Sequence, residues 1–316
     1  MELTSIGSPG LWAGFILFVL AMLALDLGVF HRKAHVVSFR EAGIWSAVWI
    51  GLALLFGAGV WLKAGPEPGM QYLTGYLIEK SLSIDNIFVF VIIFSSLSIP
   101  ALYQHRVLFW GILSALVLRA VMIFAGAAAL ERFHWLIYVF GAFLIFTGVK
   151  LFLVWKKGDD ADPSESWFMR LARKVIPTTE KLDGDRFFTR VNGRWLGTPL
   201  LMALLLVEVT DVIFALDSIP AIFAITRDPF IVFTSNIFAI LGLRSLFFLL
   251  AGMVERFSYL KVGLSAVLVF VGAKMALIDF VKLPPPVSLA IIAALLGGSL
   301  LASWLKTRGA KPAGVS

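Results

Sequence analysis

Two apolar stretches of this chain, Tyr76–Phe94 and Leu200–Ile225, hold acidic side chains that could bind a cation inside a membrane. The candidate ligands are five carboxylates and one amide: Glu79, Asp85, Asn86, Glu208, Asp211 and Asp217. A carboxylate at the centre of a membrane helix costs about 2.5–3.5 kcal/mol on insertion scales, so this set indicates a function. Oxygen ligands without thiol or imidazole suit the hard divalent cations Mg²⁺, Ca²⁺ and Mn²⁺. We therefore interpret the six residues as ligands of a metal ion.

Two other uses of these carboxylates remain open. Lys80, Arg119 and Arg244 could form ion pairs between helices, but three cations against five carboxylates leave two unbalanced. A proton relay is another use of mid-membrane carboxylates, and it is compatible with an exchange of metal for protons. An intramembrane aspartyl protease needs a Gly-x-Gly-Asp sequence, which this chain lacks, so we expect no enzyme.

A straight helix cannot aim all these groups at one point. Glu208 and Asp211 are three residues apart and share a face, whereas Asp217 lies on the opposite side. Glu79 and Asp85 are six residues apart and point about 120° away from each other. Either the two helices unwind, or there is more than one site along a path. The expected points of unwinding are Ser81–Ser83 and Asp217–Pro220.

The composition decides the class of protein. Of 316 residues, 59% are hydrophobic and 15% are charged, whereas about 25% are charged in a soluble domain. Apolar runs long enough to cross a bilayer recur along the chain, so we expect an all-α polytopic membrane protein. The absence of cysteine excludes disulfides, thiolate metal sites and thiol catalysis. The net charge of +7 lies in loops, so it indicates membrane topology and no nucleic-acid partner.

We expect about nine transmembrane helices within one transmembrane domain, residues 1–316. They are Leu11–Phe30, Ala42–Leu62, Met70–Leu97, Val107–Ala129, Trp135–Trp155, Pro199–Ile225, Phe230–Val254, Tyr259–Phe280 and Val287–Trp304. One set of connections holds eighteen lysines and arginines and the opposite set holds four. The excess of positive charge on one side predicts that the N-terminus is outside and the C-terminus is cytoplasmic.

The long connection, residues 156–198, is then a cytoplasmic loop. Trp167–Ile176 can form an amphipathic helix at the membrane surface. Asn192-Gly193 between two short β-prone runs predicts a tight hairpin turn.

The chain also contains an internal repeat. Residues 129–153 resemble residues 253–277: Glu131-Arg132-Phe133 matches Glu255-Arg256-Phe257, and Gly148-Val149-Lys150 matches Gly272-Ala273-Lys274. The spans pair as repeat unit one, residues 70–155, and repeat unit two, residues 199–280. Each unit has three spans, an odd number, so the two copies must be inverted relative to each other. Inverted repeats with a site between them are typical of secondary transporters.

Three segments together resemble the TerC family of integral membrane proteins, in its Alx-like branch: EKSLSIDNIFVF (79–90), DGDRFF…NGR…TPL (183–200) and VEVTDVIFALDSIPAIFAIT (207–226). Bacterial members of this family are associated with tellurium resistance, an alkaline-pH response and manganese efflux. The resemblance implies that the six candidate ligands form a metal pathway. Tellurite is an anion, so we interpret the tellurium association as a phenotype and not as a substrate.

We expect an inner-membrane Mn²⁺ exporter, coupled to protons, in which Lys80, Arg119 and Arg244 tune the carboxylates. Its partners would be Mn²⁺ or other hard divalent cations, protons and the lipid bilayer, with no tightly bound cofactor. The outward direction is implied by the resemblance alone. Two alternatives stay open: a membrane scaffold or stress-response partner that acts through the cytoplasmic loop, and an exporter of another small solute such as an amino acid.

Overall fold

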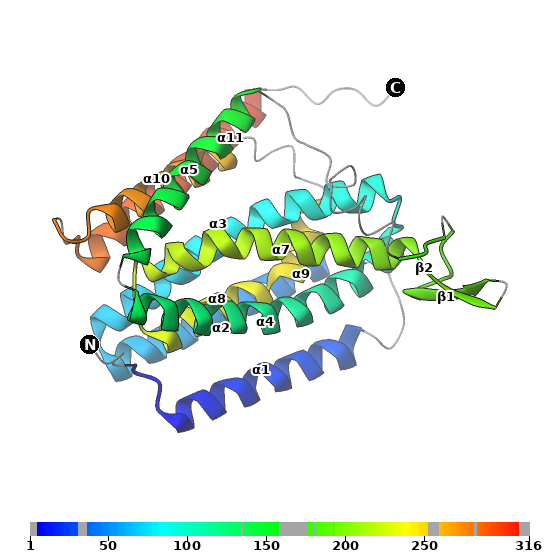
Figure 1. Ribbon diagram of the computed structural model, residues 1–316, viewed down its shortest axis with the longest axis horizontal. Helices are drawn as coiled ribbons and strands as arrows, with labels where there is room; N and C mark the ends of the chain where they lie inside the picture. Colours follow the sequence, from blue (N-terminus) through cyan, green and yellow to red (C-terminus); the bar gives the residue numbers. More distant parts are fainter. Residues whose placement is uncertain are drawn as a thin grey trace.

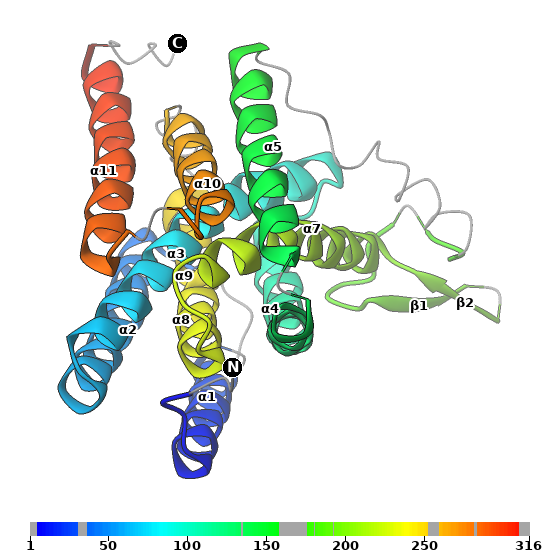
Figure 2. The same ribbon diagram turned by 60° about the vertical axis from the view of Figure 1, so that its left-hand side comes forward.

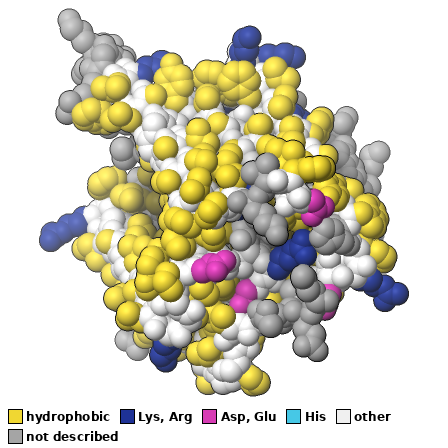
Figure 3. All heavy atoms as spheres, turned by 90° about the vertical axis from the view of Figure 1, so that its left-hand side faces the viewer, with side chains coloured by type: hydrophobic (Ala, Val, Ile, Leu, Met, Phe, Trp, Pro, Cys, Tyr) yellow, Lys and Arg dark blue, Asp and Glu magenta, His cyan; other side chains and the backbone are white. Residues whose placement is uncertain are grey.

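Helices make up most of the described residues, which agrees with an all-α membrane protein (Figure 1). The structure is a computed structural model that describes residues 5–30, 37–133, 135–157, 176–179, 181–191, 193–251, 259–280 and 283–309. The helices are α1 (Pro9–Phe30), α2 (Phe39–Ala64), α3 (Pro66–Ser96), α4 (Ala101–Arg132), α5 (Leu136–Lys157), α7 (Pro199–Phe223), α8 (Pro229–Leu241), α9 (Leu243–Leu250), α10 (Leu260–Ala276) and α11 (Pro285–Gly309). Hydrophobic side chains cover most of the face shown in Figure 3.

The helices form two groups. The helices α1 to α4 and α7 to α9 lie alongside one another, and α5, α10 and α11 cross them steeply (Figures 1 and 2). Each group has a hydrophobic core of its own. The long helices α3 and α7 contribute side chains to both cores, so they join the two groups.

Ordinary capping signals start several of these helices. The Ser38 hydroxyl accepts a hydrogen bond from the Glu41 N–H at the start of α2, at 3.2 Å. Asp228 does the same for Phe230 at the start of α8. Pro66 and Pro199 occupy the first positions of α3 and α7, where the missing N–H has no helical partner to lose.

Five helices among the described residues are long and apolar enough to cross a membrane: α2, α4, α5, α7 and Pro285–Lys306 of α11. The pair α8 and α9 makes a sixth if it is one span, bent by 41°. The predicted spans in α1, α3 and α10 coincide with helices that do not meet this test; α10, for example, has only 17 residues. A multi-pass membrane protein is therefore supported, and nine spans stay a prediction.

The predicted unwinding of the two acidic helices is wrong. Both α3 and α7 run without a break through the expected points, and α7 ends only at Phe223. The hydroxyl of Ser81 donates to the Leu77 carbonyl, at 2.7 Å, so it is satisfied inside a regular helix. Pro220 lies inside α7, where it has no N–H to donate to the Leu216 carbonyl, yet the helix continues to Phe223.

The break lies at Gly242, between α8 and α9. Lys80 of α3 reaches this point, and its Nζ donates to the Ala239 carbonyl oxygen at 3.3 Å. A Cβ on Gly242 would lie 2.8 Å from the Lys80 Nζ and 3.1 Å from the Trp49 Cβ. Glycine thus makes room for a positive charge at the C-terminal end of α8, where the helix dipole favours it.

The helices α5 and α10 approach each other through glycines. A Cβ on Gly141 would lie 2.9 Å from the Gly272 carbonyl oxygen, and one on Gly272 would lie 2.6 Å from the Gly141 carbonyl oxygen. Two turns further along α5, a Cβ on Gly148 would lie 2.8 Å from the Ser265 carbonyl oxygen. The Ser265 hydroxyl donates to the Gly148 carbonyl, at 2.7 Å. Gly141 contacts Gly272, whereas Gly148, later in α5, contacts Ser265, which is earlier in α10. The two helices are therefore antiparallel.

The predicted hairpin is confirmed. Strands β1 (Phe188–Val191) and β2 (Arg194–Gly197) pair in antiparallel register, and Gly193 has φ +79° in the turn. Arg106 of α4 forms an ion pair with Asp185, which ties this segment to the helices. Residues 167–175 of the predicted surface helix lie outside the described residues.

Candidate functional site

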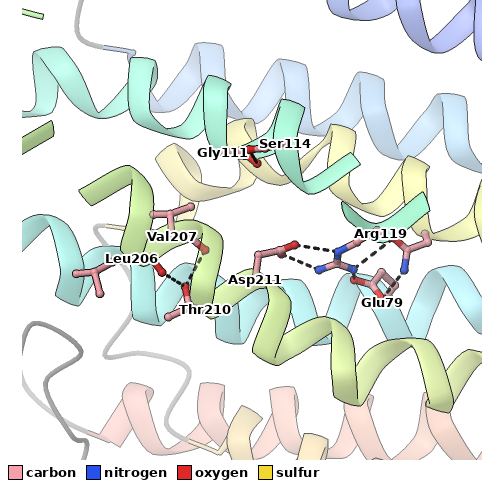
Figure 4. Close-up of polar contacts among 9 residues, drawn as sticks. Glu79, Gly111, Ser114, Arg119, Leu206, Val207, Thr210 and Asp211 are labelled. Carbon is pink, nitrogen blue, oxygen red and sulfur yellow. Dashed lines mark hydrogen bonds and ion pairs between the residues drawn. The ribbon is translucent and has the colours of Figure 1, made fainter. Parts of the chain in front are cut away.

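Arg119 is the centre of the candidate site. Its side chain projects from α4 and is 1% exposed. The Nε donates to Asp211 Oδ2 of α7 at 3.2 Å, and the Nη2 donates to Asp211 Oδ1 at 2.8 Å. The Nη1 donates to Glu79 Oε1 of α3. One guanidinium therefore lies between the two carboxylates (Figure 4).

Asn236 of α8 completes a polar ring with these residues. Its Nδ2 donates to Glu79 Oε2 at 3.1 Å, and its Oδ1 accepts from the Arg119 Nη1 at 3.3 Å. We call Glu79, Arg119, Asp211 and Asn236 the Arg119 cluster. All four side chains are buried, and each comes from a different helix. With both carboxylates ionised, the cluster carries a net charge of −1.

Glu208 lies one turn from Asp211 and also faces α4, as their spacing predicts. The Ser114 hydroxyl donates to Glu208 Oε1. The other oxygen, Oε2, is buried and has no hydrogen-bond partner among the described groups. A third carboxylate with a free oxygen therefore lies beside the Arg119 cluster.

A small cavity adjoins this arrangement. It is lined by Asp211 together with Gly111, Phe90 and Leu243, among others, from α3, α4, α7 and α9. The space open to the centre of a water-sized sphere is about 10 Å³, close to the volume that one water molecule needs. A Cβ on Gly111 would lie 2.9 Å from Val207 Cγ1, so glycine lets α4 and α7 approach closely here. The cavity has room for one small ligand next to a buried carboxylate.

Asn86 and Ser83 of α3 are buried polar groups of another kind. Asn86 is 1% exposed, and neither its amide oxygen nor its amide nitrogen has a partner among the described groups. The Ser83 hydroxyl is also buried and unpartnered in the same sense. Such groups cost free energy unless something binds them. The Asp85 side chain is outside what the structure describes, so its predicted role stays a prediction.

Asp217 lies apart from the Arg119 cluster. Its side chain accepts a hydrogen bond from Thr147 of α5 and interacts with the charge of Lys150, on the side of α7 away from Glu208, as the helical spacing predicts. Its Oδ1 is buried and unpartnered among the described groups. The structure thus joins Glu79 and Asp211 through Arg119, with Glu208 one turn from Asp211, and it leaves Asp217 elsewhere.

Within the described residues, no three acidic or histidine side chains converge closely enough to hold a metal ion. The guanidinium of Arg119 occupies the space between Glu79 and Asp211 that a cation would need. A bound ion would have to displace this guanidinium. The assignment of the six residues as metal ligands stays a prediction.

Sequence reasoning missed Asn236 and Ser114. An amide in the middle of the apolar run FIVFTSNIFAIL was a usable signal, since a buried amide needs partners. Ser114 gave no such signal, because a serine in a helix can bond its own backbone, and this hydroxyl also lies 2.7 Å from the Trp110 carbonyl oxygen.

Comparison with known proteins gives concordant results. The sequence pattern of the integral membrane protein TerC family matches residues 64–311. The "Uncharacterized membrane protein STKORF319" of Myxococcus xanthus is 76% identical over 306 residues, which cover 97% of this chain and 95% of that protein. The "Putative membrane-bound redox modulator Alx" of Escherichia coli K12 is 47% identical over 322 residues, which cover 99% of this chain and 100% of that protein. A membrane protein of Rickettsia bellii is 44% identical over 295 residues, with 93% and 97% covered. No solved structure matches the chain.

Proposed function

This chain belongs to the TerC family of integral membrane proteins, in its Alx-like branch, and on that premise we propose that it exports Mn²⁺ across the bacterial inner membrane in exchange for protons. The Arg119 cluster is the observation that carries the proposal. Its two carboxylates are buried among the helices with a single guanidinium between them, and a third carboxylate lies one turn away. An excess of buried negative charge is what a divalent cation requires.

The chemistry proceeds by exchange of partners. Without a bound ion, Arg119 pairs with both Glu79 and Asp211. A divalent cation that enters takes over these carboxylates and adds the free oxygen of Glu208. Mn²⁺ prefers oxygen ligands in octahedral geometry, so water or further oxygens such as that of Asn86 would fill the remaining positions. When the ion leaves, Arg119 returns or a carboxylate takes up a proton, which couples metal movement to proton movement.

An inverted repeat of residues 70–155 and 199–280 is part of this proposal, and the contact of α5 with α10 supports it. The repeat pairs Gly141 with Ser265 and Gly148 with Gly272. Gly141 contacts Gly272. If each residue is replaced by its counterpart in the other unit, this pair becomes Ser265 with Gly148, which is also an observed contact. A two-fold axis in the membrane plane would produce this exchange and the antiparallel packing. The cluster takes Glu79 and Arg119 from one unit and Asp211 and Asn236 from the other, as an inter-repeat site requires.

The name of the Alx relatives, redox modulator, is compatible with this function. With no cysteine, this chain cannot exchange thiols with a partner. Removal of a redox-active cation such as Mn²⁺ from the cell would alter redox chemistry there without any redox group in the protein. The net negative charge of the cluster disfavours an anion such as tellurite as cargo.

The test is Mn²⁺ flux in proteoliposomes that hold the purified protein and a pH-sensitive dye. Glu79→Gln removes one charge from the cluster, and we expect it to reduce flux about tenfold or more, which corresponds to ~1.4 kcal/mol. The matched control is Glu67→Gln on the same helix. Glu67 is exposed in the first turn of α3, so this variant keeps the wild-type flux.

Proton movement opposite to Mn²⁺ supports coupled exchange. Folded protein that carries no Mn²⁺, Mg²⁺ or Ca²⁺ at any pH gradient would overturn the proposal. In that case, deletion of the hairpin of β1 and β2 would test the scaffold function instead.

A further inference from the structure

A deep apolar groove runs between α1 and α2, with side chains of α8 at its base. Its volume is about 590 Å³, within the range of pockets that enclose small ligands. The lining includes Gly14 and Phe18 of α1, Leu52 and Gly59 of α2, and Phe238 of α8. Lys63, near the end of α2, is the charged residue among its lining residues. This groove is separate from the Arg119 cluster and shares no residue with it.

The groove exists because α1 is attached on one side only. Trp12 packs edge-on against Phe230 of α8, with ring centroids 5.0 Å apart, and Phe18 packs against Phe238 at 5.8 Å. The chain before α1 is also tied to α8, since the Ile6 N–H donates to the Asp228 carboxylate at 2.7 Å. The side of α1 towards α2 has no comparable set of ring contacts among the described residues except that of Phe15 with Phe56.

Glycines keep the groove open. A Cβ on Gly14 or Gly59 would meet no atom within 4 Å, and one on Gly10 would meet only the Ser8 hydroxyl, at 4.0 Å. These glycines are therefore not required by close helix packing. Their effect is to leave space along both walls.

The length of the groove matches one leaflet of a bilayer. From Leu52 to Lys63 the helix rises about 16 Å, and half of the hydrocarbon core is about 15 Å. Lys63 lies next to Ala64, the last residue of α2, where a membrane helix reaches the headgroup region. No described acidic side chain forms an ion pair with Lys63. The groove is thus apolar over the depth of an acyl chain and positive at its headgroup end.

We propose that this groove binds one anionic phospholipid, with an acyl chain between α1 and α2 and the phosphate at Lys63. A transmembrane helix of a second copy fits less well, because it needs about 30 Å of apolar surface and the groove offers about half of that. The proposal is independent of the cation that the protein carries.

Native mass spectrometry tests the proposal on the full chain, equilibrated with equal amounts of phosphatidylglycerol and phosphatidylcholine. We expect one phosphatidylglycerol to remain on each monomer after detergent exchange. Gly59→Leu fills the groove and should reduce the bound fraction about tenfold. The matched control, Gly51→Leu, lies on the same helix, also meets no atom within 4 Å, and does not line the groove, so it keeps the lipid.

The headgroup is tested separately. Lys63→Gln should remove the preference for phosphatidylglycerol over phosphatidylcholine, whereas Lys157→Gln at the exposed end of α5 should keep it. Unchanged lipid retention in Gly59→Leu overturns the proposal, and so does a wild-type protein that retains both lipids equally. A dimer that dissociates in Gly59→Leu would assign the groove to a second copy instead. The unfolding temperature of each variant shows whether it is folded.

Discussion

At the scale of residues, Arg119 decides whether two buried carboxylates are tolerated. Its planar guanidinium offers donors in a fixed fork, which lets it bind Asp211 with two nitrogens while a third atom reaches Glu79. A lysine would present a single ammonium and could not serve both geometries. Removing the cation leaves two uncompensated charges among apolar helices, which is more costly than losing the pair as a whole.

We therefore predict that Arg119→Ala lowers the free energy of unfolding in mild detergent by about 3–5 kcal/mol. Arg106→Ala on the same helix is the control, because its ion pair with Asp185 is partly exposed, with side chains 32% and 53% accessible. That loss should be within about 1 kcal/mol. Equal losses in the two variants, measured by chemical denaturation, would contradict the buried charge balance described for Arg119.

Part of this site follows from the sequence. The shared face of Glu208 and Asp211, and the separate position of Asp217, come from helical geometry alone. The partner of each carboxylate does not. Arg119 is 40 residues from Glu79 and 92 from Asp211, and Asn236 is 157 residues from Glu79. Lys80 is adjacent to Glu79 in sequence, yet it bonds the backbone of α8. Such pairings depend on helix packing, which a single sequence does not specify.

At the scale of elements, close backbone approach fixes how helices meet. The helices α5 and α10 touch through backbone atoms at Gly141 and Gly272, where any side chain would collide with a carbonyl oxygen. The short distance between these helices therefore depends on the absence of a Cβ atom at Gly141 and Gly272. Helix pairs in membranes commonly use small residues in this way.

We predict opposite effects for two glycine-to-alanine changes. Gly272→Ala places its Cβ 2.6 Å from the Gly141 oxygen, so it should force the helices apart and lower the free energy of unfolding by about 1–3 kcal/mol. Gly297→Ala in α11 meets no atom within 4 Å and should raise it by about 0.5–1 kcal/mol, as alanine favours a helix. Thermal unfolding of both variants in one detergent gives the comparison. The same sign for both would contradict the contact.

The helix breaks show where sequence reasoning fails at this scale. Serines and a proline suggested breaks in α3 and α7, but the Ser81 hydroxyl bonds its own helix and α7 continues past Pro220 to Phe223. The break at Gly242 lies in a continuous apolar run, and a lone glycine there has no distinguishing pattern. The feature that distinguishes this break is its contact with Lys80, which belongs to α3 and is far away in sequence.

At the scale of the whole molecule, contacts between helix ends agree with the topology that the lysine and arginine counts of the connections predict. Ser5 and Ile6, before α1, bond Asp228 at the start of α8, so these two helices begin at the same end of the molecule. Arg106, near the start of α4, holds Asp185 just before the hairpin and α7. An N-terminus outside and a hairpin inside would satisfy both contacts.

The natural lack of cysteine makes this topology easy to test. We predict that Glu67→Cys, in the first turn of α3, reacts with a membrane-impermeant maleimide in intact spheroplasts. Lys181→Cys, before the hairpin, should react only after the membrane is opened. Both side chains are exposed, and the parent chain is an unreactive control. Labelling of Lys181→Cys alone in intact spheroplasts would reverse the assigned orientation.

The membrane class was predictable because composition sets it, but the number of spans was not. Because α3 contains charged residues and α10 has only 17 residues, neither helix meets the criteria of length and hydropathy for a candidate membrane span. The assignment of both helices as membrane spans stays a prediction.

On the proposed inverted repeat of residues 70–155 and 199–280, the reciprocal contact between α5 and α10 also has a meaning for ancestry. An early gene that encoded only three helices would have produced a protein able to insert in either direction. Two oppositely inserted copies could then have met through the same surface, with the glycine of one copy against the position of Ser265 in the other. Duplication and fusion of that gene would free each half to diverge. The different residues that the two halves now place around Arg119 would be the record of that divergence.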